Sequence, residues 1–297
     1  MTRIQAHLVC IALVAVDVIV RTWRFQWILR GLRFDVPFRD VLALNLVGDA
    51  ASAITPLRIG GEPARLAALA RERIPLTAGL VAVGIEIVVM WPVILIASGI
   101  LALLYAPQWW TEVEPHLAST VRVGWPWVAL VVAASVLTWI AARRAFPSAS
   151  HTVRRSMRRA LAYARRMPRW PLLAGIPLTL VGLAARVAIL PVLALTLSSP
   201  PPIGPLSFAS FALLYGQLLL PTPSGAGVVE LGFLGGAVGD LGGELGAILL
   251  LWRFYTTFVL VALGLVLGVR HYGRAAVSAM LRGRPAAAAA RAVPERD

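Results

Sequence analysis

The sequence predicts an all-α polytopic membrane protein, a helical bundle with two re-entrant helical hairpins related by an inverted repeat. Composition is the first reason: 59% of the residues are hydrophobic and 14% are charged, against about a quarter charged in soluble domains. Apolar runs of ~20 residues, the length that crosses a bilayer, recur along the chain. Two proline–glycine stretches, ITPLRIGGEPARL (54–66) and LPTPSGAGVVEL (220–231), interrupt this apolar pattern.

The basic residues indicate a membrane protein and its orientation in the bilayer. All 28 are arginine, and the formal net charge is +14, a balance that in a soluble protein would point to nucleic acid. Here the arginines gather at the ends of apolar segments, as the positive-inside rule requires. We therefore expect no nucleic-acid partner. The lack of lysine beside abundant alanine is typical of a GC-rich bacterial genome, so we expect a multi-pass protein of the bacterial inner membrane.

The first membrane half is expected over residues 1–142. Its first span, about 4–28, continues without a cleavage site and is therefore read as an uncleaved helix. A 17-residue apolar stretch (40–56) and a short amphipathic piece (62–72) flank the first proline–glycine stretch. Two further spans follow, at 76–105 and 124–142.

The second membrane half is expected over residues 171–270, after a basic linker. That linker, 143–170, holds nine arginines at helical spacing and predicts an amphipathic helix on an anionic cytoplasmic leaflet. Spans are expected at 172–197 and 245–269, separated by the segment 205–243. The tail, 271–297, is basic and then alanine-rich, and is expected to be disordered near its end.

Orientation follows from the arginine bias and predicts the hairpins. The linker 143–170 and the tail should be cytoplasmic, as should the arginine clusters at 21–39 and 71–73. Both ends of 40–72 then lie on the cytoplasmic side, so this segment must enter the membrane and return. By the same reasoning, 205–243 enters and returns from the opposite face.

The two halves also match in sequence. A shift of 167 residues places Thr55-Pro56 on Thr222-Pro223 and Gly60 on Gly227, and it places Glu86 on Arg253. Inverted repeats whose broken helices meet near the midplane are a transporter architecture. Irregular backbone at that depth is tolerated where it is buried in protein or faces a wet cavity, and the N–H groups it frees favour an anion.

Charged residues inside the expected spans need a partner or water, because each costs at least ~2.5–3.5 kcal/mol at a helix centre. For Glu86, Arg186 and Arg253 both a functional role and a purely structural ion pair remain open. Asp17 lies at helical spacing before Arg21 and Arg24, which favours a structural role. The charges of the first hairpin tip, Arg58, Glu62 and Arg65, are read as functional.

Several other classes of site are excluded or disfavoured. Cys10 is the only cysteine, so one chain can hold neither a disulfide nor a cysteine metal cluster. The four histidines are scattered, which implies no metal site, and no catalytic set of residues is visible. Gly225 and Gly227 lack a preceding strand and the GK[ST] ending of an ATP-binding loop. We therefore expect no enzyme activity and no cofactor.

Both motifs resemble those of the lysylphosphatidylglycerol synthase transmembrane (flippase-like) family. In the stretch NLVGDAASAITPLRIGGEPARLAALARERIPLTAGLVAVGIE, the matching positions are Asn45, Pro56, Arg58, Gly60, Gly61, Glu62, Arg65 and Glu86. The second motif is similar to the family's later signature at Pro221, Pro223, Gly225, Gly227, Glu230 and Arg253. Ile87 stands where the family often has arginine, and we expect the chain to lack the soluble aminoacyl-transferring domain of full-length lipid aminoacyl synthases.

The resemblance implies a lipid-translocating membrane module without synthase chemistry. Its cargo would be a phospholipid, a modified phospholipid or a polyisoprenyl-linked lipid. Membrane lipids are thus the expected partners, and a lipid-modifying enzyme is a further candidate. The expected headgroup site comprises the residues of the two hairpin tips and the intramembrane charges: Asn45, Arg58, Gly60, Gly61, Glu62, Arg65, Glu86, Arg186, Pro223, Gly225, Gly227, Glu230 and Arg253. A non-transporting partner that presents lipid to a separate synthase or glycosyltransferase is the alternative, and a membrane-embedded transferase is a weaker third.

Overall fold

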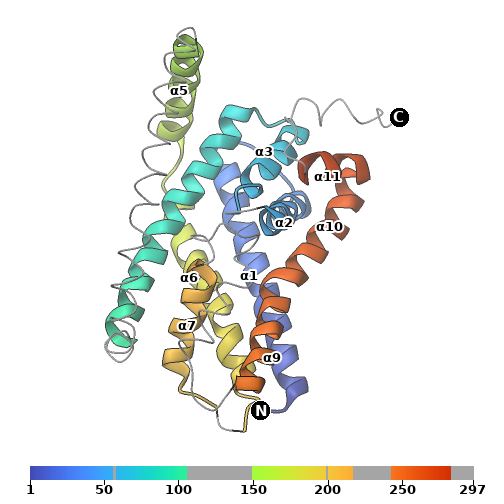
Figure 1. The fold of residues 1–297 in the computed structure, drawn as a ribbon. Helices are drawn as coiled ribbons and strands as arrows, with labels where there is room; N and C mark the ends of the chain where they lie inside the picture. Colours follow the sequence, from blue (N-terminus) through green and yellow to red (C-terminus); the bar gives the residue numbers. More distant parts are fainter. Residues whose placement is uncertain (56–57, 106–148, 199, 217–241, 282–297) are drawn as a thin grey trace, which may run out of the picture.

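A computed structural model describes residues 1–55, 58–105, 149–198, 200–216 and 242–281. Within these ranges the chain folds into helices and contains no strand (Figure 1). The first half holds α1 (Arg3–Gly31), α2 (Phe38–Ile54), α3 (Gly61–Arg71) and an unlabelled helix, Leu76–Tyr105. The second holds α5 (Ala149–Arg166), α6 (Trp170–Ala194), α7 (Ile203–Gly216), α9 (Gly242–Arg253), a π-helical turn (Phe254–Phe258), α10 (Val259–Tyr272) and α11 (Arg274–Leu281).

Four helical stretches of the described chain are long and apolar enough to cross a membrane: Arg3–Gly31, Leu76–Tyr105, Trp170–Ala194 and Gly246–Tyr272. Each has 25 to 30 residues, or about 38–45 Å at 1.5 Å per residue. Four of the five spans expected from the sequence are thereby found, and the all-α membrane fold class is confirmed. The fifth, 124–142, lies outside the described residues.

The pair α1 and α6 forms the centre of the bundle, and small residues set how closely they approach. A Cβ on Gly182 would lie 3.1 Å from Val20 and 3.3 Å from Asp17, both on α1. Gly175 likewise faces Arg24 of α1, and a Cβ there would lie 2.9 Å from Val89. Small residues of this kind let transmembrane helices pack at short distances.

The helices α2 and α3 form a hairpin, and glycines between its two arms allow them to pack closely. A Cβ on Gly61 would lie 2.0 Å from the Ser52 hydroxyl, and one on Gly48 would lie 2.5 Å from the Arg65 side chain. Gly60 donates its backbone N–H to the Thr55 hydroxyl at 2.9 Å, across the turn. At 17 and 11 residues, both arms are shorter than a typical span.

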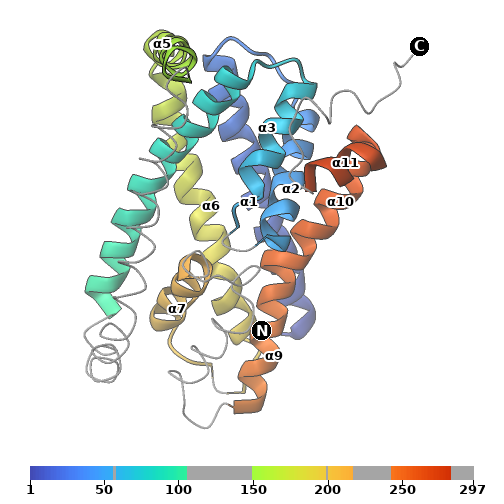
Figure 2. The same cartoon turned by 45° about the horizontal axis from the view of Figure 1, so that its top comes forward.

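The helix α10 also packs closely against α2, through two glycines one turn apart. A Cβ on Gly264 would lie 2.1 Å from the carbonyl oxygen of Leu46, and one on Gly268 would lie 2.5 Å from Val47. This Gly-x-x-x-Gly spacing is typical of close packing between transmembrane helices. The first hairpin is thereby packed against the last long helix, as both views show (Figures 1 and 2).

Several helix ends lie together at one end of the bundle, as their side-chain contacts show. The Trp27 and Trp170 rings lie 5.9 Å apart, which places the end of α1 beside the start of α6. The start of α2 meets the end of α10, where the Tyr272 hydroxyl donates to the carbonyl of Asp40. Arg71, at the end of α3, donates to the carbonyl of Tyr272. The two outer ends of the α2–α3 hairpin therefore lie at the same end of the molecule.

Two further expectations can be compared with the structure. The segment 274–281, assigned to the tail, is the helix α11, and its Ala276, Val277 and Met280 are buried against α2 and α3. This part of the tail is helical because its apolar residues share one face. The expected second hairpin is described only in part, as α7 and α9, since its tip at 217–241 lies outside the described residues. The membrane re-entry of the hairpins and the inverted repeat stay predictions.

Candidate functional site

Glu86 is held between two arginines in the interior of the bundle. Its Oε1 accepts from Arg24 Nη2 at 2.7 Å, and its Oε2 accepts from Arg65 Nη2 at 2.5 Å. Arg24 also donates to the Thr179 hydroxyl at 3.0 Å, and Arg65 donates to both carboxylate oxygens of Glu62 at 3.2 and 3.3 Å. We call this set of five residues the Glu86 network.

The Glu86 network joins four elements with balanced charge. It links α1, α3, the helix Leu76–Tyr105 and α6, and its two arginines face two glutamates. The side chains of Arg24 and Glu86 are only 4% and 9% exposed, and the Arg65 guanidinium lies 4.2 Å over the Phe25 ring. The two arginines and two glutamates balance in charge and are joined by hydrogen bonds, which offsets much of the cost of burying them, although Nε of Arg24 and of Arg65 has no hydrogen-bond partner in the described structure. We interpret the network as the structural centre of the bundle.

A second group of charges surrounds Arg21. Its guanidinium donates twice to the Asp49 carboxylate, at 3.1 and 3.0 Å, which is the bidentate geometry that arginine favours. Its Nε lies 3.1 Å from Asp17 Oδ2, and Arg186 Nε donates to the same oxygen at 2.8 Å. These contacts connect α1, α2 and α6.

Arg58 brings the turn of the first hairpin into this group. It adopts a positive φ of 58°, is half-buried, and lies within electrostatic range of Arg21, Asp49, Arg186 and Arg253. We call the set the cationic cluster: Asp17, Arg21, Asp49, Arg58, Arg186 and Arg253. Arg253 also interacts beyond this set. Without it, three arginines still face two aspartates, so unlike the Glu86 network the described cluster has an excess of positive charge.

The cationic cluster lies in the middle part of the bundle, where Asp17 is the fifteenth residue of the 29-residue helix α1, and it is partly open. Arg186 is the seventeenth residue of the 25-residue helix α6, about 24 Å from its start at 1.5 Å per residue. The side chains of Arg21, Asp49 and Arg186 keep 19%, 15% and 24% of their surface exposed. Arg253 ends α9 directly before the π-helical turn, a distortion common at functional sites. Tyr215, near the end of α7, lies within electrostatic range of Arg186.

The structure thus divides the residues predicted for one site into separate groups. Arg58, Arg186 and Arg253 are in the cationic cluster, where Arg186 and Arg253 lie within electrostatic range of Arg58, whereas Glu62, Arg65 and Glu86 belong to the Glu86 network. Gly60 and Gly61 close the hairpin turn. Asn45 is buried on α2, and its Nδ2 has no hydrogen-bond partner within the described chain. The remaining four, Pro223, Gly225, Gly227 and Glu230, lie outside the described residues.

Sequence reasoning missed several members of these groups. Asp17 does pair with Arg21 as its spacing indicated, but Arg24 turns instead to Glu86. Asp49 was passed over, although an acidic residue inside an apolar stretch is a signal in its own right. Thr179 and Tyr215 carry no comparable signal, because uncharged polar residues are common in transmembrane helices.

Comparison with known proteins agrees with the motifs. A family model described as the lysylphosphatidylglycerol synthase TM region matches residues 2–264, which contain the Glu86 network and the cationic cluster. Neither the curated proteins nor the solved structures gave a match. Since the matched residues include both motifs, three of the four long apolar helices and most of the fourth, this chain is a multi-pass membrane protein that belongs to the lysylphosphatidylglycerol synthase transmembrane-region family.

Proposed function

We propose that this protein is a bacterial inner-membrane lipid flippase that moves a phospholipid, modified phospholipid or polyisoprenyl-linked lipid between leaflets. The observation that carries the proposal is the excess positive charge of the described cationic cluster inside the bundle, beside the turn of the first hairpin. A lipid headgroup phosphate would balance this excess. The acyl chains would stay in the bilayer while the headgroup passes through the cluster.

Arginine chemistry supports a phosphate as the ligand. A guanidinium presents its donors in a planar fork that matches phosphate oxygens, and charge-assisted hydrogen bonds are roughly twice as strong as neutral ones. Arg58 and Arg186 would contact the phosphate directly, with Arg253 completing the site. Glu62, whose side chain is 49% exposed, is the glutamate that we assign to an amine on the headgroup. Glu86, whose two carboxylate oxygens accept hydrogen bonds from Arg24 and Arg65, would stabilise the helices around the site and would not contact the lipid.

The proposal includes no chemical step. Neither an ATP-binding motif nor a catalytic set is visible in the sequence, so the transport would be downhill or coupled to an ion. The protein would act as a transporter and not as an enzyme, with its arginine-rich segment 143–170 on the cytoplasmic side.

A leaflet-exchange assay tests the proposal. Protein reconstituted in vesicles with a fluorescent phospholipid should expose the inner-leaflet probe to an impermeant quencher faster than protein-free vesicles do. Arg58→Gln should slow the exchange at least tenfold, because a hydrogen bond to a charged group contributes about 1.5–3 kcal/mol. Arg73→Gln is the matched control: Arg73 has the same φ of 58° but is exposed at the molecule's surface, so its exchange rate should stay unchanged.

A second candidate function comes from the family description. The matched family is named for the membrane region of a synthase, which favours a partner that presents lipid to a separate lipid-modifying enzyme. The same vesicles separate the two candidates. Lipid that co-purifies with the wild type but not with Arg58→Gln, without any leaflet exchange, would support the presenting partner and count against the flippase.

A further inference from the structure

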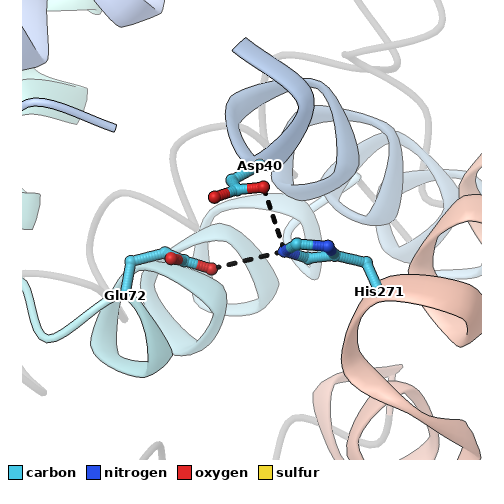
Figure 3. A group of neighbouring side chains, drawn as sticks. All are labelled: Asp40, Glu72 and His271. Carbon is cyan, nitrogen blue, oxygen red and sulfur yellow. Dashed lines mark ion pairs between the residues drawn. The ribbon is translucent and has the colours of Figure 1, made fainter. Parts of the chain in front are cut away.

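Three ligand-type side chains meet at the end of the bundle where the first hairpin contacts α10. Asp40 lies in the first turn of α2, Glu72 follows the last residue of α3, and His271 lies in the last turn of α10. Nε2 of His271 lies 3.4 Å from Asp40 Oδ1 and 3.5 Å from Glu72 Oε1 (Figure 3). Their donor atoms all lie within 4.8 Å of one another.

The contacts within this group leave one buried carboxylate oxygen, Asp40 Oδ1, without a hydrogen bond. Separations of 3.4 and 3.5 Å exceed the 2.7–3.2 Å range of ordinary N–H···O hydrogen bonds. Asp40 is only 7% exposed, and its buried Oδ1 has no hydrogen-bond partner in the described structure. Arg39 Nε, 3.2 Å from the same oxygen, belongs to a side chain that is 83% exposed. A buried carboxylate oxygen in this state costs free energy unless something binds it.

The two separations from His271 Nε2, 3.4 Å to Asp40 and 3.5 Å to Glu72, match those between ligands of one metal ion. Around a tetrahedral Zn²⁺ with bonds of 2.0–2.1 Å, neighbouring ligand atoms lie about 3.3–3.4 Å apart. One imidazole with two carboxylates suits transition metals better than Mg²⁺ or Ca²⁺, which prefer oxygen ligands alone. Glu72 and His271 keep 22% and 29% of their side-chain surface exposed, so an ion could reach the group from solvent and keep one water ligand.

We propose that Asp40, Glu72 and His271 form a divalent transition-metal site of the Zn²⁺ class. The bound ion would join both outer ends of the α2–α3 hairpin to the end of α10. The hydrogen bonds to backbone carbonyls at this junction, Tyr272 to Asp40 and Arg71 to Tyr272, are both long at 3.4 Å, so a bound ion would strengthen it. The site is distinct from the cationic cluster, and it would stabilise the hairpin whatever the hairpin transports.

Cobalt is a direct probe of this site, because Co²⁺ in a low-coordinate nitrogen and oxygen environment absorbs visible light more strongly than hydrated Co²⁺. Chelator-treated protein in detergent should bind Co²⁺ with one such absorbing site per chain, and Zn²⁺ should displace it. His271→Gln should weaken Co²⁺ binding by more than about 100-fold, since loss of even an outer-shell partner costs 10- to 100-fold. His7→Gln, which alters a half-exposed histidine bonded to Tyr255, should bind as the wild type does.

Thermal unfolding provides a second readout that does not depend on colour. Zn²⁺ should raise the Tm of the wild type and of His7→Gln but not that of His271→Gln, while equal Mg²⁺ should raise none of them. Asp40→Asn tests the buried ligand, and Glu72→Gln tests the exposed one if Asp40→Asn fails to fold. The proposal is overturned if the wild type gives no absorbing Co²⁺ site, or if His271→Gln binds Co²⁺ as tightly as His7→Gln does.

Discussion

Arg186 donates a hydrogen bond of 2.8 Å to Asp17, across 169 residues of sequence. The same carboxylate oxygen lies 3.1 Å from Arg21 Nε, so a single aspartate on α1 faces two arginines. The Asp17 side chain is 4% exposed. This pairing brings α1 and α6 together at the depth where the hairpin turn places Arg58, and it connects the stability of the bundle to the charge of the proposed site.

Replacing Asp17 should therefore destabilise the protein strongly. Asp17→Asn keeps the shape but leaves two arginines without this charge, and breaking a buried ion pair costs about 3–5 kcal/mol. The free energy of unfolding in mixed micelles measures the loss. Asp35→Asn is the control, since its carboxylate pairs with Arg30 but is 87% exposed and should cost no more than about 1 kcal/mol. Equal losses in the two variants would contradict the assignment.

The two glutamates of the Glu86 network should differ in their effect. Glu86→Gln removes the charge shared by Arg24 and Arg65 in a closed environment, so a loss of about 3–5 kcal/mol is expected. Glu62→Gln removes a half-exposed partner of Arg65 and should cost less than about 1 kcal/mol. Unfolding of both variants under the same conditions gives the comparison. A larger loss for Glu62→Gln would show that Arg65 depends on the hairpin turn and not on Glu86.

Because α10 lies so close to α2, adding one methyl group between them should lower the stability of the protein strongly. Gly264→Ala places a Cβ only 2.1 Å from the Leu46 carbonyl oxygen, so the helices must separate and the Tm should fall. Gly99→Ala is the matched control, because a Cβ on this other transmembrane glycine would meet nothing within 4 Å. Its Tm should stay constant or rise slightly, as alanine favours helices by roughly 0.5–1 kcal/mol over glycine.

Much of the fold was predictable because membrane physics leaves few choices. Length and hydropathy located four long helices, since a span needs ~20 apolar residues. The Pro56–Gly61 break separated α2 from α3 because proline and glycine both end helices. The helix α11 was missed because its eight residues are too few to show a clear apolar period beside an alanine-rich tail.

The candidate site was less predictable, because pairing between helices depends on distances that a sequence does not contain. Intramembrane charge identified Glu86, Arg186 and Arg253 as important, yet it could not show that Glu86 joins Arg24 and Arg65. Sequence spacing likewise related Arg24 to Asp17, seven residues earlier on the same helix, while the structure turns Arg24 toward another helix. Because the histidines are scattered along the sequence, no metal site was expected, and only the fold brings His271 beside Asp40 and Glu72.

Re-entry of the first hairpin is a prediction that labelling can test. The contacts at Asp40, Arg71 and Tyr272 place both outer ends of the hairpin at one end of the bundle, and the arginine bias predicts that this end faces the cytoplasm. Single cysteines introduced in a Cys10→Ala background at Asp35 and Arg73, both exposed, should react with an impermeant maleimide only when the cytoplasmic side is accessible. Ser198→Cys, beyond the far end of α6 and also exposed, should react from the opposite side. Labelling of positions 35 and 73 from opposite sides would make α2 and α3 a crossing segment and remove the hairpin turn from the middle of the membrane.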